Sequence, residues 1–177
     1  PTAIVFLSIH IINNNKPIKI IKIETSFEVY DSIKELATPI QNLILKATEA
    51  RKKAYAPYSE FLVGAALELE NGQHIAGNNQ EKPPSLRIIA ERTAIYYAGA
   101  EFPDQKIIRM VIVAGSTTNP TTKPSRLVVL VAGIALSEYE VKQNMPMELY
   151  FMGTSGQIAY SNSVENSLPW IFDKTVL

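Results

Sequence analysis

The sequence predicts one three-layer α/β/α domain, in which helices cover both faces of a mixed sheet of about five strands. Two observations lead to this prediction. Helical and strand patterns follow one another in the order α-β-β-α-β-α-β-β, an order that packs helices against a single sheet. The run 107–114 is mostly apolar, as expected for a strand that is buried on both faces. With 177 residues, 46% of them hydrophobic, the chain is large enough for one substantial core.

The first half of the domain is predicted as a helix followed by a hairpin. Apolar residues recur with helical spacing over 38–54. The run 61–70 has the composition of a strand, and the Asn71-Gly72 pair after it is a strong signal for a tight hairpin turn. The segment 73–79 is therefore expected to return as the neighbouring antiparallel strand.

The second half is predicted as two further helices that alternate with strands. The composition of 90–100 is helical, and the buried strand 107–114 follows it. A third helix is expected over 132–142. The segments 148–152 and 157–161 are short and rich in apolar and aromatic residues, so they are predicted as the last two strands.

Residues 1–26 are predicted to form an N-terminal extension, and residues 27–177 the domain itself. The stretch 3–12 is apolar and carries no formal charge, but it has no basic leader, no small-residue cleavage site and too few residues to cross a bilayer. We therefore do not expect a signal peptide. Because the chain begins without Met and continues into three consecutive asparagines, we interpret the extension as appended or mistranslated, and so non-native. An extra edge strand is the alternative.

The charge balance and the lack of cysteine exclude several classes of partner and site. Seventeen Lys and Arg residues balance 17 Asp and Glu residues without any basic run, so neither nucleic acid nor a membrane surface is an expected partner. The chain has no cysteine, which excludes a disulfide framework. With only His10 and His74 as further candidates, the residues of an ordinary zinc site are also missing.

Four short segments carry a more specific functional signal. The segment 55–67 reads Tyr-Ala-Pro-Tyr-Ser-Glu-Phe-Leu-Val-Gly-Ala-Ala-Leu and is followed by Asn-Asn-Gln-Glu at 78–81. Ala-Glu-Arg-Thr-Ala occupies 90–94, and Leu-Pro-Trp-Ile-Phe occupies 168–172. In this order and spacing, the segments resemble the cytidine deaminase family of small zinc-dependent nucleoside deaminases. The resemblance extends over residues 27–172 and implies the cytidine-deaminase fold.

The resemblance also implies a role for one or more residues in each segment. The family recognises a pyrimidine base and its ribose through separate groups, and moves protons with a glutamate. The implied residues are Glu91 as the proton shuttle, Asn79 and Glu81 as ribose contacts, backbone groups near Ala90 as partners of the base edge, and Phe61 and Phe172 as walls of the base pocket, with Phe172 reaching a neighbouring subunit's site.

The residue types fit these roles, although each one alone has a simpler explanation. An amide and a carboxylate two residues apart on one strand face supply a donor and acceptors to the vicinal diol of a ribose. Alone, Asn79 and Glu81 would more often be solvated at a strand end, and Phe61 would belong to the core. Glu91 alone would be a surface acid that compensates the helix dipole. Their joint occurrence, in the family's order, favours the functional interpretation.

The family's zinc ligands are missing from this chain. In the family, three thiolates hold the metal, one directly before the Ala-Glu pair and two, three residues apart, at a helix start, where the dipole favours thiolates. The resemblance places these sulfurs at Ile89, Val129 and Ala132, none of which can bind a metal. His74 alone cannot replace them. Zinc is thus the cofactor expected for the family, but the sequence as written supports no metal site.

Two windows, 82–87 and 125–132, depart from the family pattern in a way that a shifted reading frame can reproduce. The run 125–132, Ser-Arg-Leu-Val-Val-Leu-Val-Ala, is strand-like where a helix start is expected. Codons for the family pattern Ile-Pro-Pro-Cys-Gly-Ala-Cys-Arg, read from their second base, can encode this run. Codons for Asn-Ala-Ser-Phe-Pro-Ser that lose one base can encode 82–87. We favour a frameshift, with deliberate redesign or real divergence as alternatives.

The predicted function follows from the resemblance. It implies hydrolytic deamination of cytidine or deoxycytidine to uridine or deoxyuridine in pyrimidine salvage, by a cytoplasmic homodimer or homotetramer. The chain as written is expected to be inactive, because it lacks the metal that activates water. The alternative is a metal-free pseudoenzyme that binds nucleoside or has only a structural role. A nucleic-acid deaminase is disfavoured by the zero net charge.

Overall fold

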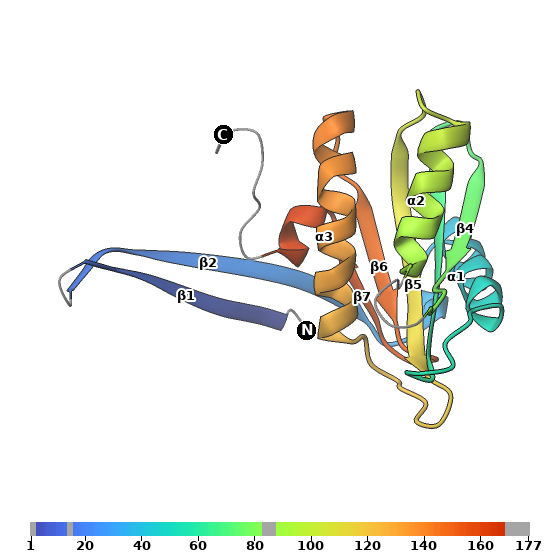
Figure 1. Ribbon diagram of the computed structural model, residues 1–177, viewed down its shortest axis with the longest axis horizontal. Helices are drawn as coiled ribbons and strands as arrows, with labels where there is room; N and C mark the ends of the chain where they lie inside the picture. Colours follow the sequence, from blue (N-terminus) through green and yellow to red (C-terminus); the bar gives the residue numbers. More distant parts are fainter. Residues whose placement is uncertain (1–2, 14–15, 83–87, 169–177) are drawn as a thin grey trace.

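Seven strands form one sheet in the computed structural model, which describes residues 3–13, 16–82 and 88–168 (Figure 1). The order of the strands across the sheet is β1-β2-β7-β6-β5-β3-β4. The elements are β1 (Ala3–Asn13), β2 (Lys16–Tyr30), the short 3-10 helix η1 (Ile33–Glu35), α1 (Thr38–Lys52), β3 (Phe61–Leu69), β4 (His74–Asn78), α2 (Ala90–Glu101), β5 (Ile107–Ser116), α3 (Arg126–Gln143), β6 (Glu148–Met152), β7 (Ile158–Ser161) and a second 3-10 helix, η2 (Val164–Ser167).

The sheet is mixed, as predicted, because β5 and β6 run parallel while the other neighbouring strands run antiparallel. The predicted number of about five strands is too low, since β1 and β2 extend the sheet at one edge. Only Glu28–Tyr30 of β2 pairs with β7, and the rest of β2 pairs with β1 in a long arm that projects from the body (Figure 1). β2 also runs through the expected boundary between residues 26 and 27.

Helices cover both faces of the sheet, which confirms the three-layer α/β/α class. α1 packs on one face, where Leu43, Ile44 and Ala47 are fully buried against strands β3, β5 and β6. α2 and α3 lie side by side on the opposite face (Figure 1) and bury Ile95 and Leu136 in a second core. Burying apolar side chains on both faces is the main source of the fold's stability.

α1 lies unusually close to the sheet because β3 carries a glycine beneath it. A side chain at Gly64 would place its Cβ 2.1 Å from the carbonyl oxygen of Ala47, so only glycine permits this approach. The guanidinium of Arg51 then donates to the carbonyl oxygens of Leu62 at 3.1 Å and Gly115 at 2.7 Å. These two bonds fix the end of α1 over β3 and β5.

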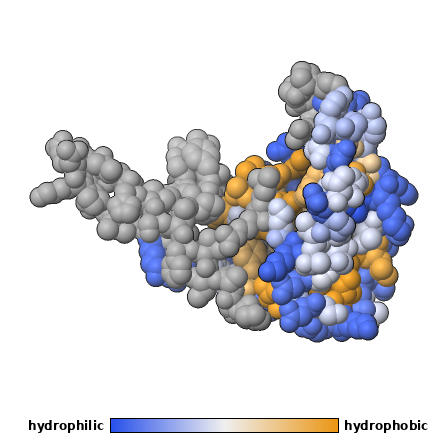
Figure 2. Space-filling model, turned by 90° about the horizontal axis from the view of Figure 1, so that it is seen from below, coloured by the Kyte–Doolittle hydropathy of each residue, from blue (hydrophilic) through white to orange (hydrophobic). Residues whose placement is uncertain are grey.

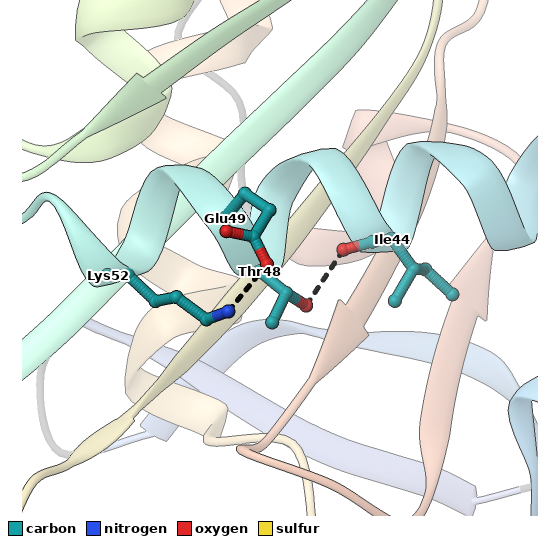
Figure 3. A network of polar contacts seen from close by, with 4 residues as sticks. All are labelled: Ile44, Thr48, Glu49 and Lys52. Carbon is teal, nitrogen blue, oxygen red and sulfur yellow. Dashed lines mark hydrogen bonds and ion pairs between the residues drawn. The ribbon is translucent and has the colours of Figure 1, made fainter.

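Away from the sheet, α1 carries polar contacts along its own axis. The hydroxyl of Thr48 donates to the carbonyl oxygen of Ile44 at 2.8 Å, and the ammonium of Lys52 pairs with Glu49 at 2.6 Å (Figure 3). Both members of the ion pair are largely exposed, so the pair contributes at most about 1 kcal/mol to stability. The helix is therefore held mainly by its buried face.

The predicted start of the third helix at residue 132 was wrong: α3 begins at Arg126 and so includes almost all of the strand-like run 125–132. Val128 and Val129 pack against the core shared with α2, and Ala132 is fully buried in it. Helix propensities differ by less than about 1 kcal/mol per residue for such side chains, so burial of this face outweighs the preference of valine for strands.

The surface combines hydrophilic regions with gathered apolar residues. Seen from below, hydrophobic residues collect toward the middle of the molecule, and hydrophilic residues cover much of the remaining described surface (Figure 2). Exposed apolar or aromatic side chains include Tyr96 and Tyr97 of α2 and Ile134 of α3. Among the described residues, no helix is both long and apolar enough to cross a membrane.

Candidate functional site

Asn79 and Phe61, two predicted substrate contacts, are in direct contact where β4 ends beside the start of β3. The Asn79 amide nitrogen donates to the carbonyl oxygen of Phe61 at 3.0 Å, and its amide oxygen accepts from the backbone N–H of Val63 at 2.8 Å. The backbone N–H of Asn79 donates to the Val63 carbonyl oxygen at 3.1 Å. Asn79 is 9% exposed, so these bonds hold its amide in one orientation.

Glu81, the second predicted ribose contact, is buried beneath the exposed turn that leads into β3. Its Oε2 accepts hydrogen bonds from the backbone N–H groups of Tyr58 and Ser59, both at 3.1 Å. Its Oε1 accepts from the Ser59 hydroxyl at 2.6 Å. Two successive N–H groups form a concave anion-binding site, and a third donor strengthens it. Glu81 is only 4% exposed, and these donors offset the cost of burying its carboxylate.

The segment between these two residues is clamped from both sides. On one side, the backbone N–H of Tyr55 donates to the carbonyl oxygen of Asn79 at 3.1 Å, and the Tyr55 carbonyl oxygen accepts from the backbone N–H of Glu81 at 2.8 Å. On the other side, Gln80 and Ile88 exchange two backbone hydrogen bonds, of 2.9 and 3.1 Å. Because Ile88 lies two residues before α2, this bridge brings the predicted ribose contacts next to the predicted proton shuttle.

Glu91 lies in the first turn of α2 and is 2% exposed. Burial raises the pKa of its carboxyl from 4.5 to about 7, although its own backbone N–H and the nearby Arg92 partly oppose the shift. Among the described residues, no group bonds to its Oε2. A carboxyl with a pKa near neutrality, and with one oxygen unused, can accept or give a proton at physiological pH. This is the property that a proton shuttle requires.

Ala90 is the first residue of α2 and has no exposed surface. α2 approaches β4 closely there, since a Cβ at Gly77 would lie 2.6 Å from the Ala90 carbonyl oxygen. The structure thus brings five predicted residues to one region, where β3 begins, β4 ends and α2 begins: Phe61, Asn79, Glu81, Ala90 and Glu91. Phe172, the remaining predicted contact, lies outside the described residues.

The positions that correspond to the family's zinc ligands are filled by apolar packing. Ile89 and Val129 pack against the core of α2 and α3, and Ala132 is fully buried within it. None of these side chains has an electron pair that binds a metal. In the described part of the chain, no three His, Cys, Asp or Glu residues are grouped so that they could hold a metal ion. The residues present therefore do not fit zinc.

His74 cannot supply a ligand because it lies on the other face of the sheet. Along β4, Ile75 belongs to the core on the α2 side, and successive residues of a strand point to opposite faces. His74 accordingly lines a groove of about 490 Å³ between α1 and β4. Burial there is the main cause that lowers its pKa.

Sequence reasoning missed the residues that hold the site together. Ser59 and Tyr55 lie in the segment 55–67 but were assigned no role, and Ile88, which directly follows the window 82–87, was assigned none either. Their contacts to Glu81, Asn79 and Gln80 join parts of the chain 8 to 26 residues apart, and no local pattern predicts such pairs. The turn signal of Pro57 was the available clue that residues 56–60 reverse direction.

Comparison with known proteins gives the same assignment. Residues 12–119 match the family model of the cytidine and deoxycytidylate deaminase zinc-binding region. This match ends before α3, and so before Val129 and Ala132. The solved cytidine deaminase from Burkholderia pseudomallei has a TM-score of 0.58 and 29% identity, over 77% of this chain and 100% of that one. The cytidine deaminase from Mycobacterium tuberculosis, at 21% identity and a TM-score of 0.56 over 77% of this chain and 99% of that one, shares the fold.

Two curated relatives are similar over different lengths. A cytidine deaminase from Halalkalibacterium halodurans is 41% identical over 81 residues, which are 45% of this chain and 60% of that protein. This match therefore spans less than two thirds of the relative. A cytidine deaminase from Sporosarcina psychrophila is 30% identical over 136 residues, which are 76% of this chain and 92% of that protein. The chain belongs to the cytidine and deoxycytidylate deaminase family.

Proposed function

We propose that this chain binds pyrimidine nucleosides in the family's pocket but does not deaminate them. The proposal is carried by one contrast within the site. Asn79, Glu81 and Glu91 are buried and grouped, whereas the metal positions Ile89 and Val129 carry apolar side chains. The groups that recognise a nucleoside are thus retained, and those that activate water are lost.

The retained groups suit a nucleoside's sugar and ring. Glu81 offers carboxylate oxygens, which accept hydrogen bonds from sugar hydroxyls, and Asn79 carries a donor and an acceptor on one group. Phe61 lies beside them and supplies an aromatic wall for the pyrimidine ring. Both polar side chains are held by backbone groups of the turn and of β3, which lowers the entropy that ligand binding costs.

The chemical step is proposed to be absent because it needs an activated water. Deaminases of this kind attack the amidine carbon with a metal-bound hydroxide, while a glutamate that does not bind the metal passes protons. Glu91 meets the second requirement but cannot meet the first. A carboxyl with a pKa of about 7 is far too weak a base to form hydroxide from bulk water.

The wider role follows from the family. The intact site would convert cytidine or deoxycytidine to uridine or deoxyuridine with release of ammonia, in pyrimidine salvage. We propose a cytoplasmic homodimer or homotetramer, in which Phe172 reaches a neighbouring subunit's site. If the windows 82–87 and 125–132 result from a shifted reading frame, the natural protein is an active zinc enzyme, and the chain described here is its metal-free form.

Titration with uridine and cytidine tests the proposal, by calorimetry or ligand-observed NMR. We expect weak binding, with a dissociation constant of about 0.1 mM to a few mM, because each lost charged or metal contact removes about 1.5 to 3 kcal/mol. The two nucleosides should bind about equally, since the metal-site groups that distinguish an amino from an oxo group are missing. Absence of any binding, or binding that does not change when Glu81 is replaced, would contradict the proposal.

A further inference from the structure

We propose that Ser59 is a positioning residue, which orients the Glu81 carboxylate toward the sugar hydroxyls of a bound nucleoside. This inference rests on the proposed function and assigns a specific part of the site to a residue outside the predicted set. Its basis is the position of Ser59 between Glu81 and Phe61, the predicted sugar contact and ring wall. The Ser59 hydroxyl donates to Glu81 at 2.6 Å and accepts from the N–H of Phe61 at 3.2 Å.

Three donors to Glu81 come from a single short turn. Tyr58 and Ser59 supply backbone N–H groups to one carboxylate oxygen, and Ser59 supplies its hydroxyl to the other. A carboxylate held at both oxygens cannot rotate about its last side-chain bond without breaking one of these contacts. The hydroxyl bond is the shortest of the three, and a hydrogen bond to a charged acceptor is stronger than a neutral one. Removing the hydroxyl therefore takes away the shortest of these three contacts and weakens the hold on the carboxylate's orientation.

The turn itself has a fixed backbone conformation. Glu60 adopts a left-handed φ of 53°, its N–H donates to the carbonyl oxygen of Ala56 at 3.0 Å, and its carbonyl oxygen accepts from Thr117 at 2.9 Å. A non-glycine residue in this region costs energy unless its surroundings hold it there. The bonds to Glu81 and to Thr117 provide this restraint. Ser59 is thus presented to Glu81 in one geometry.

The chain contains a matched pair elsewhere that provides a control. Ser163 donates to Oε1 of Glu140 at 2.6 Å, while the N–H of Val164 donates to the other oxygen at 2.6 Å. The Ser163 hydroxyl also accepts from the N–H of Glu165 at 3.1 Å. This arrangement repeats the chemistry of Ser59 and Glu81 but joins α3 to η2. Loss of the Ser59 or the Ser163 hydroxyl should therefore have a similar effect on stability, but only loss of the Ser59 hydroxyl should lower the affinity for a nucleoside.

The test compares uridine affinity, by NMR titration, in the full chain and three variants. Ser59→Ala should weaken binding about tenfold, the effect of losing one hydrogen bond to a charged group. Ser59→Thr keeps the hydroxyl and should bind nearly as well as the unaltered chain. Ser163→Ala should lower the melting temperature but leave the affinity unchanged. In a Glu81→Gln background, Ser59→Ala should cause no further large loss, because its effect passes through that carboxylate.

Other results of this titration would refute either the positioning role of Ser59 or the proposed function. If Ser59→Ala binds uridine as well as the unaltered chain, or if Ser163→Ala weakens binding equally, the positioning role is wrong while nucleoside binding stands. An equal loss from Ser59→Ala with and without Glu81→Gln would also refute it, since Ser59 would then act independently of Glu81. If the unaltered, folded chain binds no uridine at all, the proposed function fails, and the positioning role fails with it.

Discussion

The Asn79 side chain donates to the carbonyl oxygen of Phe61 at 3.0 Å, so one hydrogen bond joins a predicted sugar contact to a predicted wall of the base pocket. The same amide accepts from the N–H of Val63, which continues the link along β3. Asn79 therefore holds the start of β3 in place, in addition to its proposed contact with the sugar. A substitution there should affect folding and binding together, unlike a residue that only touches the ligand.

Asn79→Ala should abolish the remaining nucleoside binding and lower the free energy of unfolding by about 1 to 3 kcal/mol, because it leaves a backbone donor and a backbone acceptor of β3 without these partners. Asn79→Asp keeps the acceptor for Val63 but sets a carboxylate oxygen against the Phe61 carbonyl oxygen and buries a charge, so at neutral pH it should be at least as destabilising as Asn79→Ala. Urea denaturation, together with uridine titration of the folded variants, checks both effects. Unchanged stability in Asn79→Ala would show that the amide bonds do not hold β3.

Glu91 should make stability depend on pH. The pKa of its carboxyl is about 7 in the folded chain, against 4.5 for an exposed glutamate, so the unfolded chain loses this proton first as pH rises. Stability is therefore expected to fall between pH 4.5 and 7, by about 3 kcal/mol for this group alone, and to change no further at higher pH. Below pH 4.5, both states hold the proton and the group has no effect.

Glu91→Gln removes this titration while keeping nearly the same shape. Urea unfolding at several pH values should show that the variant is as stable as the unaltered chain near pH 4, and more stable at pH 8. The difference between the two chains isolates Glu91 from all other titrating groups. If the difference in free energy of unfolding between the two chains does not change with pH, the pKa of the Glu91 carboxyl is not raised by burial.

The coding DNA gives an independent prediction about the metal positions. If a frameshift produced the run 125–132, its codons should read as a Pro-Cys-x-x-Cys stretch in the adjacent frame. The codons for 82–87 should likewise restore an Asn-Ala-Ser-like stretch. Sequencing the gene and translating all three frames decides the matter. Codons without cysteine in either alternative frame would leave divergence or redesign as the explanation.

Local signals predicted most of the fold correctly. The Asn71-Gly72 turn, which follows the strand-like run 61–70, correctly predicted the β3–β4 hairpin, and the apolar run 107–114 correctly predicted β5, which lies between β3 and β6. The start of α3 was mispredicted because the preference of valine for strands is weak compared with burial against α2. Most of the length of β2 was not predicted at all.

The candidate site was only partly predictable. Asn79, Glu81 and Glu91 could be proposed because the short motifs that contain them resemble those of the deaminase family, whereas each residue alone has a simpler explanation. Their burial, and the pKa of Glu91, depend on how β4 and α2 pack, which no short motif contains. The bonds from Ser59 and Val63 join residues 16 to 22 positions apart, and such pairs are defined only once the hairpin has formed.

This chain has the deaminase fold, and we propose that it keeps the family's sugar contacts without the metal chemistry. The most direct measurement determines the zinc content of the purified chain, produced with zinc in the medium, and follows cytidine absorbance in the same sample. We expect no stoichiometric zinc and no change in absorbance, since Ile89, Val129 and Ala132 cannot bind the metal. Turnover at ordinary enzymatic rates, about 1 per second or faster, would contradict this proposal.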